Sequence, residues 1–172
     1  LGSHCRKGSR VPCEAGKYAD TLKLSACTAC EAGTFASETG SATCRGCPAG
    51  YFCPRGAQAP LECGSQALYC MANASKPISV PEGSFSTPRE SSAQLKRTGI
   101  STCPAGHSCV GGIKVACDSG VSFQSLEGQA TCQPCSSCDP GEWRVSACTS
   151  TQDTVCQSCA GGTHHNGTKE SL

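Results

Sequence analysis

Residues 13–47 read CEAGKYADTLKLSACTACEAGTFASETGSATCRGC, and this stretch decides the fold. Cys13 and Cys30 each open the string Cys-Glu-Ala-Gly-x-aromatic, and Cys47 opens Cys-Pro-Ala-Gly-Tyr-Phe after a second step of 17 residues. The closing cysteines, Cys27 and Cys44, are also 17 residues apart. A fixed period of this kind predicts a repeat architecture in which each repeat packs mainly against its neighbours.

Glycine follows each opening cysteine by three residues, and an aromatic residue follows that glycine by two. We expect a tight turn with positive φ at the glycine, because only glycine adopts that backbone conformation without strain. The same string begins, less strictly, at Cys103, Cys117, Cys138 and Cys159, and at Val80 with valine in the cysteine place. The aromatic side chains are expected to stack on the disulfides: Tyr18, Phe35, Phe52, Phe85 and Trp143.

The composition favours covalent links over a packed core. The 172 residues include 18 Cys, 20 Gly and 10 Pro, but only 4 Phe, 3 Tyr and 1 Trp. About one residue in ten is cysteine, the level typical of disulfide scaffolds. We therefore predict small disulfide-rich repeats in an elongated array of loops and short β-hairpins, with little regular secondary structure and no large hydrophobic core.

The cysteine spacing divides the chain into segments. Residues 13–46 hold two simple repeats, 47–70 and 103–134 hold two copies of a variant module, and 135–158 form a module of receptor-like crossed disulfides. Residues 71–102 lack cysteine, are rich in Ser, Thr and Pro, and are predicted to be a linker or insertion. The remaining segments, 1–12 and 159–172, are expected to be the end of one repeat and the start of another.

Disulfide pairs follow as a proposal, since sequence alone does not fix connectivity. In the simple repeats we expect Cys13–Cys27 and Cys30–Cys44, and in the last module Cys135–Cys148 and Cys138–Cys156. In the variant modules we expect first with third and second with fourth: Cys47–Cys63, Cys53–Cys70, Cys103–Cys117 and Cys109–Cys132. The alternative for the second variant module is Cys103–Cys109 with Cys117–Cys132. Cys5 and Cys159 are left over for intermolecular bonds or for sequence beyond the two ends.

The sequence gives little evidence for a metal site or for catalytic residues. The Cys-x-x-Cys pairs at 27/30, 44/47, 132/135, 135/138 and 156/159 have the ligand type of zinc sites, but the turn glycines and constant period indicate disulfides. A redox role is weaker still, because no βαβ pattern surrounds any pair. The His164–His165 pair is more simply explained as a solvated end. We predict no catalytic residue, metal or cofactor, and hence no enzyme.

Two families share these motifs. The strings at Cys13 and Cys30 resemble the ephrin-receptor-like cysteine-rich repeat, and residues 117–156, ending Thr-Gln-Asp-Thr-Val-Cys, resemble a tumour-necrosis-factor-receptor-type cysteine-rich domain. The resemblance implies an extracellular location and elongated stacking of repeats, and it carries over no ligand.

Two sequons, Asn73-Ala-Ser75 and Asn166-Gly-Thr168, predict N-glycosylation, and the stretch 84–92 has a composition suited to O-linked sugars. No run reaches the roughly 18 apolar residues of a membrane span. The chain starts at Leu1 without a visible secretory leader, so we expect a processed product or a segment of a longer protein.

Net charge is +1, with 14 Lys and Arg against 13 Asp and Glu and no basic block. Nucleic acid and direct membrane insertion are therefore not expected.

The first function hypothesis is an extracellular structural segment of a fibre, cell coat or surface appendage, with self-association or neighbouring repeats and glycans as partners. The alternative is a ligand-binding or adhesive receptor ectodomain at the cell surface, with Tyr51, Tyr69 and Arg144 available to a protein ligand.

Overall fold

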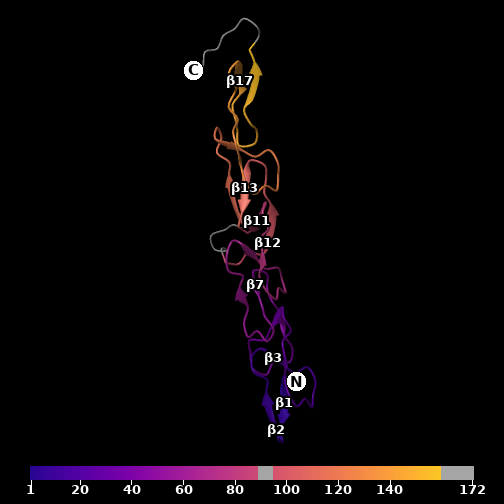
Figure 1. Ribbon diagram of the computed structural model, residues 1–172. Coiled ribbons are helices and arrows are strands. Elements are labelled where there is room, and N and C mark those ends of the chain that lie inside the picture. The colour runs from indigo at the N-terminus through magenta and orange to yellow at the C-terminus, as the bar shows by residue number, and fades with distance from the viewer. Residues whose placement is uncertain (89–94, 160–172) are drawn as a thin grey trace. The chain divides into compact units, whose positions relative to one another are not determined.

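The computed structural model describes residues 1–88 and 95–159. These residues contain no helix and consist of short strands joined by loops, as Figure 1 shows. The strands pair into nine two-stranded sheets, which confirms the predicted fold class of disulfide-rich repeats. The predictions for Asn166, His164 and His165 lie outside the described residues.

Each hairpin joins a strand that follows a turn to a strand just before the next opening position, and the turn contains glycine except before β9, where Ala67 takes its place. In the first half of the chain the pairs are β1 (Ser3–Arg6) with β2 (Ser9–Pro12), β3 (Lys17–Tyr18) with β4 (Thr28–Ala29), β5 (Thr34–Phe35) with β6 (Arg45–Gly46), β7 (Tyr51–Phe52) with β8 (Leu61–Glu62), and β9 (Leu68–Tyr69) with β10 (Ile78–Ser79). In the second half they are β11 (Ser84–Thr87) with β12 (Gly99–Thr102), β13 (His107–Val110) with β14 (Ile113–Ala116), β15 (Ser122–Phe123) with β16 (Gln133–Pro134), and β17 (Glu142–Ser146) with β18 (Val155–Ser158).

The chain divides into two compact units. Compact unit 1 comprises residues 1–80 and 86–101, and compact unit 2 comprises residues 81–85 and 102–172. Within each unit, backbone hydrogen bonds tie one repeat to the next. The opening residue donates its N–H to the turn residue of the preceding repeat, as Cys30 does to the carbonyl of Gly16 at 2.9 Å and Cys117 to that of Gly106 at 2.8 Å.

The turn glycines have the predicted conformation. Gly16 has φ +82° and Gly33 has φ +89°. A Cβ at Gly16 would also overlap the backbone carbonyl oxygen of Gly56 in a later repeat. Glycine is therefore required at this turn for two reasons, the left-handed backbone and the close approach of a neighbouring chain segment.

The repeats share a second buried site, six or seven residues after the opening residue, which we call the inner position. Its backbone N–H donates to a carbonyl of the following repeat, as in Ala36 to Ala57 at 3.1 Å and Cys53 to Ala74 at 2.9 Å. In seven repeats a small or polar side chain fills it and is buried: Ala19, Ala36, Cys53, Cys70, Ser86, Cys109 and Gln124.

The inner position explains where the disulfides form. The pairs Cys13–Cys27, Cys30–Cys44, Cys135–Cys148 and Cys138–Cys156 are those expected from the sequence. In the first two of these repeats the inner residue is alanine, and the opening cysteine bonds to a cysteine three residues before the next opening position.

The predicted pairs of the variant modules are wrong. Cys47–Cys63 and Cys53–Cys70 are replaced by Cys47–Cys53 and Cys63–Cys70. Cys103–Cys117 and Cys109–Cys132 are replaced by Cys103–Cys109 and Cys117–Cys132, the alternative pairing. The physical reason is that Cys63 opens a repeat of its own, because its N–H donates to Gly50 as Cys30 donates to Gly16. The inner cysteine is then the partner within reach.

The cysteine-free stretch 71–102 continues the repeat pattern. Its described part contains β10, β11 and β12, and the interpretation of this stretch as a linker or insertion stays a prediction. Val80 takes the opening position, donates its N–H to Ala67 at 2.8 Å, and is buried like the opening cysteines. Ser86 takes the inner position. This repeat, residues 80–102, therefore has valine and serine where its neighbours have a disulfide.

The core is small and mostly sulfur. Among the described residues, the buried apolar side chains are cysteines and alanines, together with Val80. Phe35 packs against the cluster of Cys47, Cys53 and Ala57, as expected for aromatic stacking on a disulfide. Tyr51, which was expected to be available to a partner, packs against the same cluster. Tyr18, Phe52 and Phe85 are half-buried, but Trp143 is 46% exposed and does not follow the predicted packing.

Candidate interaction surface

One face of the β13–β14 hairpin exposes a cluster of aliphatic side chains. Val110 pairs with Ile113 and Ser108 pairs with Val115, so these four residues share a face. Val110, Ile113 and Val115 are 53%, 46% and 56% exposed. We call Ser108, Val110, Ile113 and Val115 the aliphatic face.

The opposite face of this hairpin is packed. It carries the buried Cys109, disulfide-bonded to Cys103, and Lys114, whose Nζ lies 4.9 Å from the centre of the Phe85 ring. The hairpin is thus anchored from one side and presents apolar side chains on the other. Its turn is Gly111–Gly112 with φ of +57° and +77°, the two-residue geometry that matches strand twist.

Sequence reasoning did not identify the aliphatic face, although its signal is in the sequence. Val110-Gly-Gly-Ile113 places two glycines between apolar residues, which is a hairpin signal, and Ile113 and Val115 alternate with polar Lys114. The prediction used residues 110–116 only as the spacing between Cys109 and Cys117 and drew nothing from their side chains.

The residues predicted to be available to a partner have different surroundings. Tyr51 packs on the Cys47–Cys53 cluster, and the Lys96 Nζ lies 5.3 Å from the centre of its ring. Tyr69 is half-buried in β9. Only Arg144, in β17, is exposed. These three residues lie in different strands.

Trp143 and Val145 are exposed on β17, and Val155 is exposed on β18. In an earlier repeat the equivalent aromatic, Phe35, is covered by Cys47, Cys53 and Ala57 of later repeats. Because an aromatic at this position packs against following repeats, the exposure of Trp143 is weaker support for a partner site than the aliphatic face.

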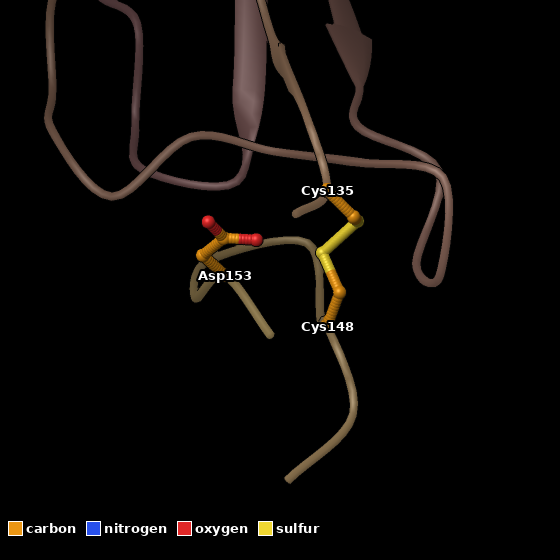
Figure 2. A group of neighbouring side chains, drawn as sticks. All are labelled: Cys135, Cys148 and Asp153. Carbon is orange, nitrogen blue, oxygen red and sulfur yellow. A yellow bond between two sulfur atoms is a disulfide. The ribbon is translucent and has the colours of Figure 1, made fainter. Parts of the chain in front are cut away.

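One cluster has the residue types of a metal site. Cys135, Cys148 and Asp153 lie with their potential ligand atoms within 4.8 Å of one another (Figure 2). The two sulfur atoms are bonded to each other, so they offer no thiolate to a metal. Asp153 instead accepts hydrogen bonds from Ser136 N and Oγ, at 2.7 and 2.6 Å.

The other cysteines of the Cys-x-x-Cys pairs are also in disulfides, except Cys159. Zinc coordination needs deprotonated thiols, which disulfide sulfur does not supply. Cys5 is exposed and Cys159 half-buried, and both are free thiols in this structure. Cys5 stands at an inner position, since its backbone N–H donates to the carbonyl of Leu24 at 2.8 Å. Cys159 stands at an opening position, since its backbone N–H donates to the carbonyl of Gly141 at 2.8 Å.

Asn73 is exposed and its φ is +61°. Its N–H donates to the carbonyl of Cys47 at 2.8 Å, as Gly40 donates to Cys13 and Gly56 to Cys30. Asparagine is the residue other than glycine that best tolerates this backbone conformation. The first sequon therefore stands at a site that earlier repeats fill with glycine.

Comparison with known proteins gives one family match. Residues 117–156 match the TNFR/NGFR cysteine-rich region, and the match includes β15, β16, β17, the first half of β18 and the crossed pairs Cys135–Cys148 and Cys138–Cys156. No curated protein matches the chain. The described residues include no helix that is long and apolar enough to cross a membrane. The match and the eight disulfides indicate an extracellular or secreted, receptor-like segment, and the matched family is not one of enzymes.

Proposed function

We propose that this chain is a non-catalytic, extracellular protein-binding segment of a receptor-like protein, and that the aliphatic face contacts its protein ligand. The observation that carries the proposal is the exposure of Val110, Ile113 and Val115 on one face of an anchored hairpin. Small disulfide-rich domains contain few apolar side chains, so three exposed aliphatic residues on one face of a hairpin favour a role in contacting another protein.

The test is site-specific photocrosslinking. A photoreactive phenylalanine derivative in place of Val115 should give a discrete adduct when the secreted chain is applied to cells of its source. Excess unlabelled chain should compete for that adduct, whereas the variant V110S/I113S/V115S should not. The same photoreactive residue in place of Leu22, which is 74% exposed in compact unit 1, is the matched control. Equal adducts from both positions would exclude a specific ligand at the aliphatic face.

A structural role is the second candidate, and the hydrogen-bonded succession of repeats supports it. In this role, Cys5 and Cys159 would link neighbouring copies or neighbouring repeats of a longer chain. Negative-stain microscopy of unreduced protein tests it: long regular fibres that disperse on reduction would support the role, and particles of one size would exclude it.

Glycosylation would accompany either role. We expect a glycan on Asn73, detected as a mass loss after enzymatic deglycosylation of protein secreted from eukaryotic cells. Asn73→Gly should abolish the glycan and keep the fold, because glycine fills the equivalent position at Gly40 and Gly56. The ephrin-receptor-like character of residues 13–46 also remains a proposal.

A further inference from the structure

The two compact units carry opposite formal charge, which the net charge of +1 conceals. Residues 1–80 and 86–101 contain 11 Lys and Arg against six Asp and Glu, whereas residues 81–85 and 102–172 contain three against seven. Compact unit 1 therefore has an excess of five positive charges, and compact unit 2 an excess of four negative charges. Three of the basic residues of unit 1 lie close together in its first hairpin.

That hairpin, β1–β2, carries three exposed cations within five residues, Arg6, Lys7 and Arg10. Lys7 and Gly8 form its turn, with φ of +49° and +78°. Arg6 lies opposite Ser9, and Arg10 lies opposite Cys5. Because successive residues of a strand point to opposite faces, Arg6 and Arg10 project from different faces with Lys7 at the tip.

A pocket of about 310 Å³ lies beside the hairpin. Its lining includes His4, Arg6 and Lys17, with Glu14 as its acidic member. The pairing of His4 with Val11 puts His4 on the same face as Arg6, which is the face toward the pocket. His4 Nδ1 lies 3.2 Å from the sulfur of Cys27, which holds the ring against the Cys13–Cys27 disulfide.

We propose that the β1–β2 hairpin and this pocket bind a sulfated polysaccharide. One sulfate group would enter the pocket between Arg6 and Lys17, and the neighbouring sulfates would contact Lys7 and Arg10. Arginine suits this ligand, because its planar guanidinium donates two parallel hydrogen bonds to an oxyanion.

Two observations favour a polysaccharide over other polyanions. The disulfides and the family match indicate an extracellular location, where sulfated polysaccharide is available and nucleic acid is not the expected partner. The tip residues, Lys7 and Gly8, offer no large apolar side chain to insert into a bilayer.

The negative charge of Glu14 in the pocket wall disfavours binding of an anion, and this provides a test of the proposal. Its carboxylate accepts a hydrogen bond from Lys17 Nζ at 2.9 Å, so it partly neutralises that cation. Replacing Glu14 with Gln removes one negative charge from the pocket wall. The variant should bind the polyanion more tightly, and a folding defect does not produce such a gain.

The experiment measures binding of the purified, disulfide-bonded chain to heparin, used as the sulfated probe, over a range of salt concentrations. The wild-type chain should bind with an affinity that falls as salt rises. R6Q/K7N/R10Q should weaken binding about tenfold or more, and E14Q should strengthen it about twofold to threefold. Asn is chosen at position 7 because it tolerates positive φ.

The matched control is R45Q/R55Q/K76Q, which removes the same charge from other exposed positions of compact unit 1. If both triple variants weaken binding equally, heparin responds only to net charge and the hairpin site is wrong. Binding to phosphatidylserine vesicles without binding to heparin would also overturn the proposal. So would self-association that R6Q/K7N/R10Q abolishes without any heparin binding, because the hairpin would then bind the acidic unit of a second copy.

Discussion

Asp153 shows how a single carboxylate organises one module. It accepts hydrogen bonds from Ser136 N and Oγ and from Thr154 N, the last at 2.7 Å. These donors stabilise the charged form, so the pKa of Asp153 lies below its ordinary value of 3.8, with the Ser136 hydroxyl as the largest cause. Figure 2 shows the carboxylate beside the Cys135–Cys148 disulfide, where it ties together the segments after each cysteine.

The lowered pKa gives a prediction about acid. A group whose pKa is depressed in the folded state stabilises the fold above its unfolded pKa and loses that effect as pH falls through the folded value. Asp153 should therefore stabilise the module fully at neutral pH and lose this contribution progressively below about pH 4.

Hydrogen exchange at the Ser136 amide measures this effect. Asp153→Ala should speed exchange at neutral pH relative to the parent chain, whereas Asp153→Asn, which keeps an acceptor oxygen, should have a smaller effect. Unchanged exchange in Asp153→Ala would contradict the role assigned to this carboxylate.

At the scale of elements, the repeat 80–102 lacks the disulfide that its neighbours have. Val80 and Ser86 stand at the positions of Cys47 and Cys53, and of Cys103 and Cys109. We expect V80C/S86C to form a disulfide and to stabilise the chain by about 2 kcal/mol, the value for a loop of this length in the chain-entropy model.

The double variant should contain the same number of free thiols as the parent chain, whereas V80C and S86C alone should each contain one more. Thiol titration under denaturing conditions makes this comparison. Two additional free thiols in the double variant would show that the repeat 80–102 departs from the geometry of its neighbours.

The sequence predicted the simple repeats and missed the variant ones for a physical reason. The 17-residue period made Cys13–Cys27 and Cys30–Cys44 predictable, and it placed the turn glycines correctly. The inner position gave no cysteine signal there, because alanine fills it in both repeats. Counting six residues from each opening cysteine aligns Ala19 and Ala36 with Cys53, and this alignment contains the correct pairing.

The candidate surfaces were less predictable than the fold. The interpretation of Trp143 as packed was wrong, because Trp143 is exposed on β17, whereas Phe35 at the equivalent position packs against the cluster of Cys47, Cys53 and Ala57. The basic hairpin was missed because charge was summed over the whole chain, where the acidic unit cancels it. Pairing registers, such as His4 with Val11, decide which side chains share a face, and they are not readable from composition.

At the scale of the whole molecule, the chain depends on its disulfides. The buried apolar residues in its described part are nearly all cysteine and alanine, which provide little hydrophobic stabilisation apart from the sulfur links. Each disulfide contributes about 2 to 3 kcal/mol by limiting the unfolded chain, and eight are present.

Complete reduction should therefore unfold both compact units at neutral pH without denaturant. Hydrogen exchange before and after reduction measures the loss, and alkylation with mass analysis verifies that all 18 cysteines are reduced. Slow exchange that survives full reduction would show that the hydrogen bonds between repeats hold the fold by themselves.

The choice between the two disulfide patterns also determines where the chain tolerates change. A link from the opening cysteine to the inner position closes before the second strand of the hairpin, so it leaves the connecting loop outside the covalent ring. The distance from one opening residue to the next varies in the repeats that have this link and in the repeat that has no disulfide: it is 16, 17, 23 and 14 residues for the repeats that open at Cys47, Cys63, Val80 and Cys103. In the two simple repeats the distance is 17 residues each time. Gly56 and Ala57 are held by backbone hydrogen bonds to an earlier repeat, so residues 58–60, which follow them, are the natural point for grafting a foreign peptide, and the protein could serve as a display scaffold.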